Sequence, residues 1–383
     1  MDLDVVSPSI ADLRRRARRR MPHFAFEYLD SGTGEERGVR TNREALDAVR
    51  FRPAILRGEI VPDLRRATLG HEHPVPFGIA PVGLAGILWP HAERRLAEGA
   101  ARNGIPYGQS SVAAALPEDT GPIAGALGWF QHYPVNDAGI RHDMLRRIGD
   151  AGWRVLVVTV DVPGESRRER QRRAQVAMPP AMTPRILASI AARPAWALGM
   201  ARAGVPRMAF PGSYVPGAKG KDHFTHAGRI IRGFPDDAYL EAVRREWDGP
   251  LVVKGVQDPE DAERLIGMGA DAIWVSNHAG RQFEGGPAAL DALPPVVERV
   301  AGRVPVYYCS GVSGGLDILR ALALGAEFVF LGKAWYFALA AHGPRGIDHL
   351  VHVLREDMIA NMTQIGARSF AELQGRLVQA PAA

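Results

Sequence analysis

The stretch Ala272-Ile273-Trp274-Val275-Ser276-Asn277-His278-Ala279-Gly280-Arg281-Gln282 joins a short apolar run to a polar loop. Its first four residues have the length and composition of a buried strand. His278 and Arg281 follow that run, so both side chains can enter one pocket at the strand end. A histidine can accept a proton near neutral pH, and an arginine can bind a carboxylate through two parallel hydrogen bonds. The stretch therefore indicates a site where an organic acid loses a proton or a hydride, although a solvent-facing turn also explains these two residues alone.

Apolar runs of this kind occur eight times after residue 75. They are Pro76–Ala80, Ile105–Gln109, Leu127–Gln131, Val155–Val160, Leu251–Lys254, Ala272–Ser276, Val304–Cys309 and Glu327–Leu331. Helical patterns lie between most of them, at Ala92–Asn103, Ile140–Ala151, Ala238–Glu246, Pro259–Met268, Leu290–Val300 and Gly315–Leu324. Eight strand–helix units with uniformly apolar strands predict an α/β fold, the parallel (β/α)8 TIM barrel. A doubly wound open sheet is the competing architecture.

We expect one domain over residues 1–383. Its predicted parts are an N-terminal helical segment (1–74), the barrel (75–350), a long insertion after the fourth strand (163–237) and a C-terminal helical tail (351–383) with a loose end. The insertion contains an amphipathic stretch, Pro184–Met200. A connection of this length predicts a lid or a structural role, and membrane-surface contact is the alternative.

Composition narrows the class of protein. The chain has 383 residues, of which 46% are hydrophobic and 23% charged, as in a soluble globular enzyme. Cys309 is the only cysteine, so an internal disulfide is excluded. We find no signal peptide and no apolar run long enough to span a membrane, and expect a cytoplasmic protein. Part of the net charge of +5 comes from the run Arg14–Arg20, which predicts either a solvated helix face or an anionic partner. Without a zinc-ligand spacing or a nucleic-acid-binding motif, we expect neither a metal nor a nucleic acid.

Polar or conformationally special residues follow nearly every predicted strand. In chain order they are Ala80-Pro81-Val82-Gly83, Gln109-Ser110, Gln131 with Tyr133, Thr159-Val160-Asp161 with Arg168, Lys254, Ser276 with His278 and Arg281, Cys309-Ser310-Gly311, and Gly332-Lys333. In parallel barrels the C-terminal ends of the strands carry the chemistry. A barrel built only for packing would not need such residues at these ends, so the pattern indicates an active site.

Taken together, these motifs make the chain resemble the FMN-dependent L-2-hydroxy acid oxidases and dehydrogenases, a family that includes glycolate oxidase, L-lactate dehydrogenase and mandelate dehydrogenase. The resemblance extends from Phe24 to about Leu373. The matching segments, in order, are 80–83, 129–133, 159–161, 253–255, 276–282 and 321–326. Gly83-Leu84-Ala85-Gly86 and Leu88-Trp89-Pro90 are more similar to the lactate and mandelate dehydrogenase branch than to glycolate oxidase.

The resemblance implies four catalytic residues. His278 would be the active-site base, and Asp161 would orient it and stabilise the imidazolium that forms. Tyr133 would hydrogen-bond the substrate hydroxyl or the charge that develops on its oxygen. Lys254 would lie near the N1–C2=O edge of the flavin, where a positive charge favours the anionic reduced form.

The resemblance also implies the binding residues. Arg281, Arg168 and Tyr28 would bind the substrate carboxylate. The remaining residues expected to bind FMN are Ala80, Pro81, Val82, Gly83, Ser110, Gln131, Thr159, Ser276, Cys309, Ser310, Gly311, Ser313, Gly332 and Lys333.

The chain departs from the family pattern where the ribityl and phosphate groups of FMN would bind. Cys309 replaces an aspartate, Ser313 replaces an arginine, and Lys333 replaces a second arginine. The glycine turn that leads into the helix at Gly315 still offers backbone N–H groups and the positive end of a helix dipole. We therefore expect FMN to bind, but less tightly than is usual in the family.

The resemblance implies oxidation of a small L-2-hydroxy acid to the 2-keto acid, with electrons passing from reduced FMN to a quinone or to O2. Gly83, where oxidases of the family more often carry alanine, favours a dehydrogenase. The family also implies a homotetramer, and a quinone acceptor would suit peripheral contact with the cytoplasmic membrane face. Two alternatives are a flavoenzyme that tailors a specialised metabolite or a peptide-derived substrate, and a cofactor-free barrel that acts as a binding protein.

Overall fold

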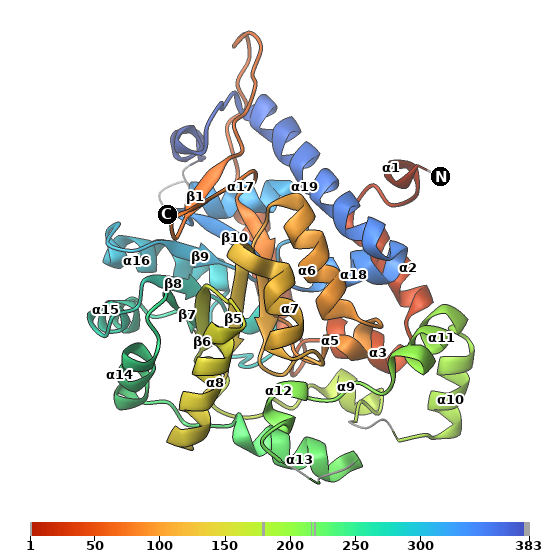
Figure 1. Cartoon of the computed structure of the whole chain (residues 1–383). Helices are drawn as coiled ribbons and strands as arrows, with labels where there is room; N and C mark the ends of the chain where they lie inside the picture. Colours follow the sequence, from red (N-terminus) through yellow and green to blue (C-terminus); the bar gives the residue numbers. More distant parts are fainter. Residues whose placement is uncertain (1, 178–180, 216, 218–219, 379–383) are drawn as a thin grey trace.

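A closed barrel of eight parallel strands forms the centre of the molecule (Figure 1). The computed structural model describes residues 2–177, 181–215, 217 and 220–378. The strands are β3 (Phe77–Ile79), β4 (Tyr107–Ser110), β5 (Gly128–His132), β6 (Val155–Thr159), β7 (Leu251–Val256), β8 (Ala272–Val275), β9 (Val306–Tyr308) and β10 (Phe328–Leu331). They pair in chain order, and β10 closes the ring against β3. The predicted barrel is confirmed, and the doubly wound open sheet is wrong.

The barrel interior is filled by aromatic side chains. Trp129, Trp274, Tyr307 and Phe330 are buried there, and the rings of Trp274 and Phe330 lie 4.1 Å apart. Large rings fill the narrow space between parallel strands, so the barrel is a packed core and not a pore. The chemistry must therefore lie at the rim.

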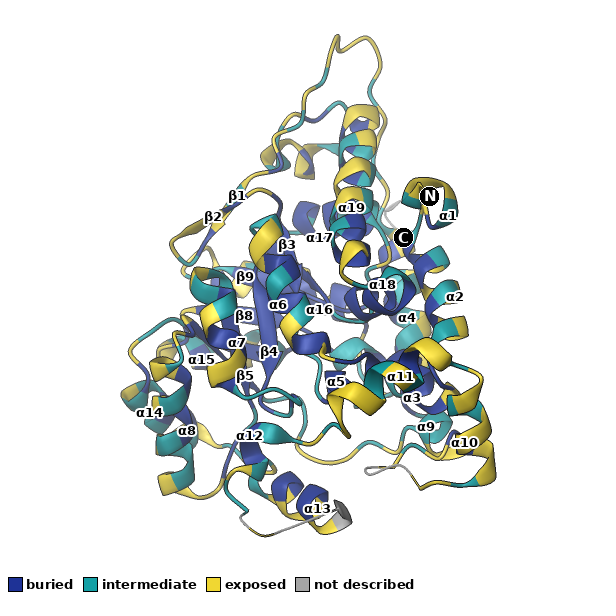
Figure 2. Cartoon of the chain, turned by 45° about the vertical axis from the view of Figure 1, so that its right-hand side comes forward, coloured by how far each residue is buried: buried dark blue, intermediate teal, exposed yellow. Residues whose placement is uncertain are grey.

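All six predicted barrel helices are present. They are α6 (Ala92–Asn103), α8 (Ala138–Asp150), α14 (Asp237–Glu246), α15 (Pro259–Gly267), α16 (Ala289–Val300) and α17 (Gly315–Ala323). Three further helices were not predicted, α5 (Ala85–Leu88), α7 (Pro117–Ala124) and α18 (Lys333–His342). Two prolines mask α7, while α18 is buried on almost every side and so has no amphipathic pattern. Figure 2 shows the buried strands surrounded by helices that mostly expose their outer faces.

The N-terminal segment contains α1 (Leu3–Val6), α2 (Ile10–Arg20), α3 (His23–Asp30) and α4 (Arg37–Ala48). An unpredicted hairpin of β1 (Arg66–Thr68) and β2 (His71–His73) follows. His73 packs against Phe328, the first residue of β10, with 5.3 Å between the rings. The hairpin therefore closes the end of the barrel opposite to the active-site rim.

The C-terminal tail contains one long helix, α19 (Pro344–Ile365), which begins before the predicted boundary at residue 351. Two short 3-10 turns follow it, Phe370–Glu372 and Gln374–Arg376. The expected loose end, residues 379–383, lies outside the described residues.

The basic run of α2 is partly used inside the molecule. Arg16 and Arg20 donate to carbonyl oxygens in the last turn of α18, at 3.1 and 2.7 Å. Arg14 pairs with Asp30 at 2.6 Å. Cations are favourable at a helix C-terminus, so these arginines attach α2 to α18. Arg15, Arg18 and Arg19 are exposed, so this part of the run forms the predicted solvated face, and the anionic partner stays a prediction.

The insertion between β6 and β7 is mainly helical. It contains α9 (Glu169–Arg173), α10 (Pro184–Ala191), α11 (Pro194–Ala203), α12 (Ala209–Gly212) and α13 (Gly220–Ile230). The predicted amphipathic stretch 184–200 is two helices, because the chain bends at Arg193 and Pro194 restarts a helix. Trp196 of α11 packs edge-on against Phe24 of α3, at 5.8 Å. In Figure 1 the insertion lies at the lower end of the barrel and the hairpin at the upper end.

Candidate active site

His278 and Asp161 form a hydrogen-bonded pair at the rim. His278 follows β8 and Asp161 follows β6, and the Nδ1 atom of His278 lies 3.0 and 3.2 Å from the two Asp161 carboxylate oxygens. With a proton on Nδ1, the ring donates to Asp161 and keeps Nε2 free to accept a proton. Burial lowers the pKa of His278, although Asp161 opposes this effect. Burial disfavours the Asp161 carboxylate, but the charges of His278 and Lys254 outweigh it and keep the pKa of Asp161 below its ordinary value. The pair thus holds a neutral base beside a carboxylate at neutral pH.

The turn that carries His278 has an uncommon backbone. His278 and Ala279 have φ angles of 55° and 57°, in the left-handed region that residues with a Cβ seldom adopt. Two side-chain hydroxyls hold this conformation: Ser276 accepts from the N–H of His278 at 3.0 Å, and Ser310 accepts from the N–H of Ala279 at 3.1 Å. Strained backbone of this kind is found where the surrounding structure fixes a functional group.

Arg281 connects the rim to the N-terminal helix α3. Its Nη1 donates to the carbonyl oxygens of Leu29 and Ser31 at 2.9 and 3.2 Å, and its Nη2 donates to that of Tyr28 at 2.9 Å. Three of the five guanidinium N–H groups are thus used, which leaves the Nε proton and one Nη2 proton. These protons can still bind a carboxylate oxygen through charge-assisted hydrogen bonds. Burial and the nearby charge of Arg168 lower the pKa of Arg281 to about 10, so it stays charged at neutral pH.

Arg168 adds a second guanidinium to the same region. Its Nε donates to the Ser166 hydroxyl at 2.9 Å and its Nη2 to the Gln282 side-chain oxygen at 2.6 Å. Sequence patterns assigned no role to Ser166, nor to Gln282 of the opening motif, because their partners become clear only in the fold. Nη1 of Arg168 makes no hydrogen bond to the part of the chain that the structure describes. Two neighbouring guanidinium groups form a site for an anion.

Tyr28 and Tyr133 place two phenols near these cations. Burial raises the pKa of both, so each keeps its proton. The Tyr28 hydroxyl donates to the Gly83 carbonyl at 2.9 Å. It can donate to a substrate carboxylate, the role that we expected, only if it leaves Gly83. The Tyr133 hydroxyl has no hydrogen-bond partner among the described residues and is free to donate.

Next to these residues, the ends of strands β4 to β7 carry buried polar side chains, some of which have no hydrogen-bond partner among the described residues. Ser110 donates to the Gln131 side-chain oxygen at 2.7 Å, but Gln131 Nε2 and Thr159 Oγ1 are buried and unpaired within the described ranges. Lys254 donates to Ser276 at 3.2 Å. Buried polar groups are nearly always paired, so these atoms indicate that a bound group completes the site.

Comparison with known proteins identifies the family. Residues 17–380 match the model of the FMN-dependent dehydrogenases. The chain belongs to this family. It is 35% identical to an L-lactate dehydrogenase of Xanthobacter autotrophicus over 96% of this chain and 95% of the relative, and 35% identical to an L-lactate dehydrogenase of Pseudomonas aeruginosa over 96% and 97%. A solved (S)-mandelate dehydrogenase, described as a monotopic membrane protein, superposes with a TM-score of 0.91 at 31% identity, over 98% of this chain and all of that one. A mandelate oxidase structure reaches 0.80 at 31% identity, over 97% and 98%. The expected resemblance to the lactate and mandelate branch is confirmed.

The dehydrogenases of this family depend on FMN, and the rim fits the flavin ring of this cofactor. Gln131, Thr159 and Lys254 offer an unpaired amide, an unpaired hydroxyl and a buried ammonium. The loops after β3 and β10 lie side by side, since a Cβ on Gly332 would come within 3.5 Å of Val82. The main chain of Ala80 is fixed by its hydrogen bond to the Leu331 carbonyl at 2.8 Å. These residues can therefore hold the isoalloxazine ring and its ribityl chain, together with Pro81.

Two positions at this rim, Gly83 and Cys309, affect how the cofactor can be held. A Cβ on Gly83 would lie 2.5 Å from the side chain of Val112, so alanine would fit there only if Val112 moved. Cys309, in place of the family aspartate, contacts the Ser276 hydroxyl through its sulfur at 3.2 Å. A thiol is a weak donor and a weak acceptor, so Cys309 holds a ribityl hydroxyl less well than a carboxylate does.

The phosphate end fits FMN less well. The Asp317 carboxylate accepts from both the N–H and the hydroxyl of Ser313, at 2.8 and 2.9 Å. Asp357 accepts from the N–H of Leu316 at 3.1 Å. The N–H groups of Ser313 and Leu316 are therefore already used, and the expectation that the glycine turn itself offers N–H groups stays a prediction. Two carboxylates at the start of α17 also oppose the binding of an anion.

The cations near this turn are partly used by other groups. Arg43 of α4 brings a guanidinium within 2.7 Å of the Ser313 hydroxyl and also bonds the Gly311 carbonyl, but it pairs with Asp317 and Asp47 as well. The sequence did not reveal this arginine, because no local pattern distinguishes it on α4. Lys333 donates to the Asp30 carbonyl at 2.7 Å, and burial lowers its pKa to about 7. FMN binding therefore has fewer free cations than the family pattern provides.

We predict that Ser313→Arg strengthens FMN binding. A guanidinium at this turn can form charge-assisted hydrogen bonds worth about 1.5–3 kcal/mol, or roughly a 10- to 100-fold lower dissociation constant. The measurement is a titration of the apoprotein by flavin fluorescence. Riboflavin, which lacks the phosphate, is the control and should bind both proteins equally. An equal gain for riboflavin, or no gain for FMN, would show that the phosphate is not bound at this turn.

We predict that Asp161→Asn lowers the rate constant of flavin reduction by a factor on the order of 10²–10⁴, the usual range for general acid–base catalysis. The folded pKa of His278 lies below 6.5, so the rate should rise with pH through a value below 6.5 and then level off. Without the carboxylate, the imidazolium is less stable and this rise should move to lower pH. Stopped-flow absorbance between pH 4 and 9 measures both effects. Asp150→Asn, at an exposed carboxylate of α8, should change neither the rate nor the profile.

Proposed function

We propose that this dehydrogenase oxidises an L-2-hydroxy acid to the corresponding 2-keto acid. The observation that carries the proposal is the juxtaposition of a proton acceptor and two cations at one rim. Arg168 Nε lies 3.3 Å from the Arg281 carbonyl oxygen, and the positive charge of Arg168 acts on His278, whose Nε2 is free. A hydroxy acid has the two groups that such a rim requires, a carboxylate for the guanidinium groups and a proton for the imidazole.

In this proposal the free edges of Arg281 and Arg168 bind the substrate carboxylate and fix the orientation of the adjacent carbon. Tyr133 donates a hydrogen bond to the substrate hydroxyl oxygen and keeps its proton. His278 Nε2 accepts a proton from the substrate, and Asp161 stabilises the imidazolium that results. FMN, when bound, supplies the two-electron acceptor. The buried ammonium of Lys254 places positive charge at the rim where the flavin ring would lie.

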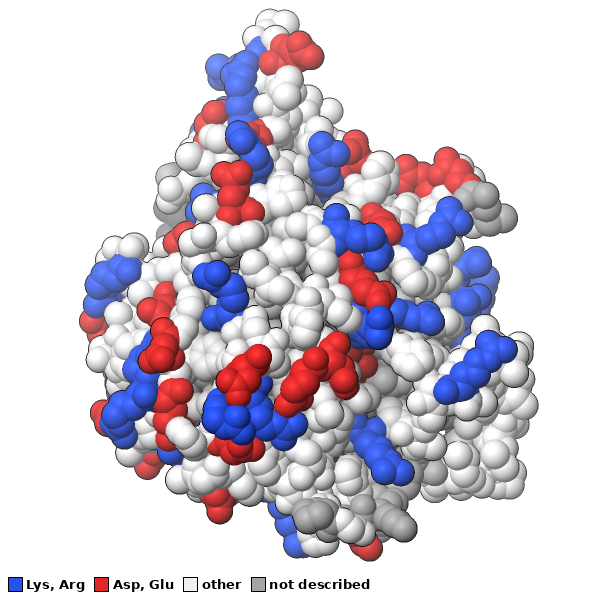
Figure 3. All heavy atoms as spheres, viewed as in Figure 1, with Lys and Arg blue, Asp and Glu red and all other residues white. Residues whose placement is uncertain are grey.

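We also propose that the electron acceptor is a quinone at a membrane surface. None of the helices in the described ranges is long and apolar enough to cross a bilayer. The sequence contains no acidic residue between Glu169 and Asp222, but several arginines. Leu187 and Leu198 on α10 and α11 are 50% and 59% exposed. Figure 3 shows basic groups and no acidic ones over these helices, and basic amphipathic helices favour anionic lipid surfaces. The related mandelate dehydrogenase that is described as monotopic supports the same view.

The homotetramer that the family resemblance implies stays a prediction. A cofactor-free binding protein would gain nothing from the unpaired rim groups, so we do not favour that alternative.

We predict that anaerobic addition of L-lactate, L-mandelate or glycolate bleaches the flavin absorbance of the holoenzyme. The D-enantiomers of lactate and mandelate should not bleach it, because the rim fixes the position of the substrate carboxylate relative to His278. His278→Ala should lower the reduction rate constant by a factor on the order of 10²–10⁴. His142→Ala, an exposed histidine of α8, is the matched control and should reduce normally. Normal reduction by the His278 variant would remove the base from the proposal.

We predict that the protein co-sediments with anionic phospholipid vesicles, and that the double variant Leu187→Ser/Leu198→Ser weakens this binding by about tenfold or more, because two partly exposed leucines lose their transfer into lipid. Ile55→Ser, on an 82% exposed side chain near the opposite end of the barrel, is the control. Unchanged binding of the double variant would place the membrane contact elsewhere. Faster reoxidation by a soluble quinone than by O2 would support the proposed acceptor.

A further inference from the structure

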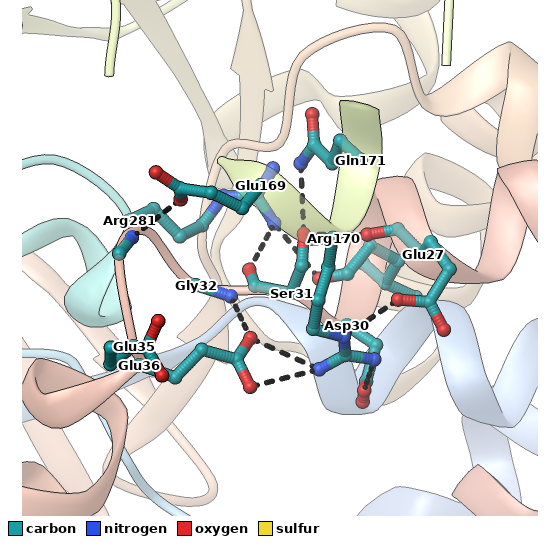
Figure 4. A network of polar contacts seen from close by, with 12 residues as sticks. Glu27, Asp30, Ser31, Gly32, Glu35, Glu36, Glu169, Arg170, Gln171 and Arg281 are labelled. Atoms are coloured by element: carbon teal, nitrogen blue, oxygen red, sulfur yellow. Dashed lines mark hydrogen bonds and ion pairs between the residues drawn. The ribbon is translucent and has the colours of Figure 1, made fainter. Parts of the chain in front are cut away.

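The first residues of the insertion contact the loop after β8, where Ser166 and Arg168 donate to the Arg281 carbonyl at 2.6 and 3.3 Å, and they also contact the N-terminal segment at the end of α3. Arg168 donates its backbone N–H to the Thr33 hydroxyl at 3.4 Å, and Glu169 accepts from the N–H of Gly34 at 2.8 Å. Gln171 donates to the Tyr28 carbonyl at 3.2 Å and to the Ser31 hydroxyl at 3.0 Å. Consecutive residues of one short loop are thus bound to one short stretch of the chain about 140 positions earlier (Figure 4).

Arg170 is the centre of this contact. Its Nε donates to Glu27 at 2.7 Å, its Nη2 to Asp30 at 2.8 Å, and its Nη1 to Glu36 at 3.0 and 3.2 Å. All three nitrogens are therefore used, each on a different carboxylate. The side chains of Glu27 and Asp30 are only 8% and 6% exposed, so the ion pairs are poorly screened by water. A planar guanidinium can bridge three such groups in a way that an ammonium cannot.

The two joined segments carry different parts of the proposed carboxylate site. Tyr28 lies on α3 between Glu27 and Asp30, and the C-terminal carbonyls of α3 hold Arg281. Arg168 directly precedes the helix that carries Arg170, and its own φ of 45° is uncommon for a residue with a Cβ. Neither segment belongs to a barrel strand, so strand pairing does not set the distance between them. A displacement of about 1 Å in such a site can cost on the order of 100-fold in rate.

We propose that Arg170 is a positioning residue: by holding α3 against the loop after β6, it brings Tyr28, Arg168 and Arg281 to one geometry for the substrate carboxylate. The inference rests on the proposed function, since it concerns how the same site is assembled. Arg170 itself contacts neither the base nor the expected flavin-binding residues. Its effect should therefore appear in the binding of carboxylates and not in the binding of FMN.

The test compares Arg170→Gln with Arg173→Gln in the flavin-bound holoenzyme. Arg173 lies on the same helix, is exposed, and makes no hydrogen bond or ion pair with any described residue, so it is a matched control for the loss of one charge. The probes are pyruvate and benzoylformate, and their dissociation constants are measured from the change in flavin absorbance. We expect Arg170→Gln to raise both constants by about tenfold or more, and Arg173→Gln to leave them within about twofold. The affinity for FMN should be the same in all three proteins.

Hydrogen exchange gives a second readout that does not depend on the reaction. Residues 23–36 and 162–177 should exchange faster in Arg170→Gln, while the barrel strands and the Arg173 variant should match the wild type. If Arg170→Gln does not fold, Glu36→Gln weakens the same contact by neutralising one partner and should show smaller changes in the same direction.

The outcomes are distinguishable. Wild-type affinity for the probes in Arg170→Gln overturns the positioning role, whatever the exchange shows. A general loss of FMN and of thermal stability, with normal affinity in the remaining holoenzyme, also overturns it and leaves Arg170 a purely structural residue. If the wild-type protein binds neither probe and no hydroxy acid reduces it, the proposed function itself fails, and faster exchange would then show only that Arg170 joins the two segments.

Discussion

The hydrogen bonds from Arg281 to the carbonyl groups at the end of α3 join the parts of this protein. Arg281 comes from the turn after β8, and α3 lies outside the barrel. A helix end leaves carbonyl groups without partners, and a buried guanidinium needs several acceptors, so each group satisfies the other. Because the carbonyls take three N–H groups, they also decide which edge of Arg281 remains for a ligand. One contact thus anchors the N-terminal segment and orients a side chain of the candidate site.

Charge is distributed unequally around the rim. Arg281, Arg168 and Lys254 gather at the rim, where Asp161 already serves His278 and Asp30 is the carboxylate that acts on Arg281. A bound anion or cofactor would offset the cost of this buried positive charge. The unpaired amide of Gln131 and the unpaired hydroxyl of Thr159 also indicate that a bound group completes the site. The carboxylate-rich contact around Arg170 lies just outside the rim and balances the positive charge there.

The end of the site expected for the phosphate differs from the rest. Around Ser313 the carboxylates of Asp317 and Asp357 occupy the turn, and the neighbouring guanidinium of Arg43 is already paired. The flavin-ring end therefore matches the cofactor better than the phosphate end does. Family membership identifies FMN as the cofactor, while the affinity depends on these few substituted positions.

The sequence by itself determined the barrel and its polar rim. Eight apolar runs and the special residues after them are local features, and parallel strands necessarily bring their C-terminal ends to one side. It could not show α18, because a helix buried on nearly every side has no polar face and so no helical periodicity in its sequence. It could not show the hairpin of β1 and β2 either, because each strand is only three residues long. Only the tertiary structure decided that Asp357 closes the turn at Leu316 and that Arg170 holds α3. The first contact joins residues 41 positions apart, and the second joins residues more than 130 positions apart. The chain has many arginines, and no local pattern shows which of them will find its partners only after folding.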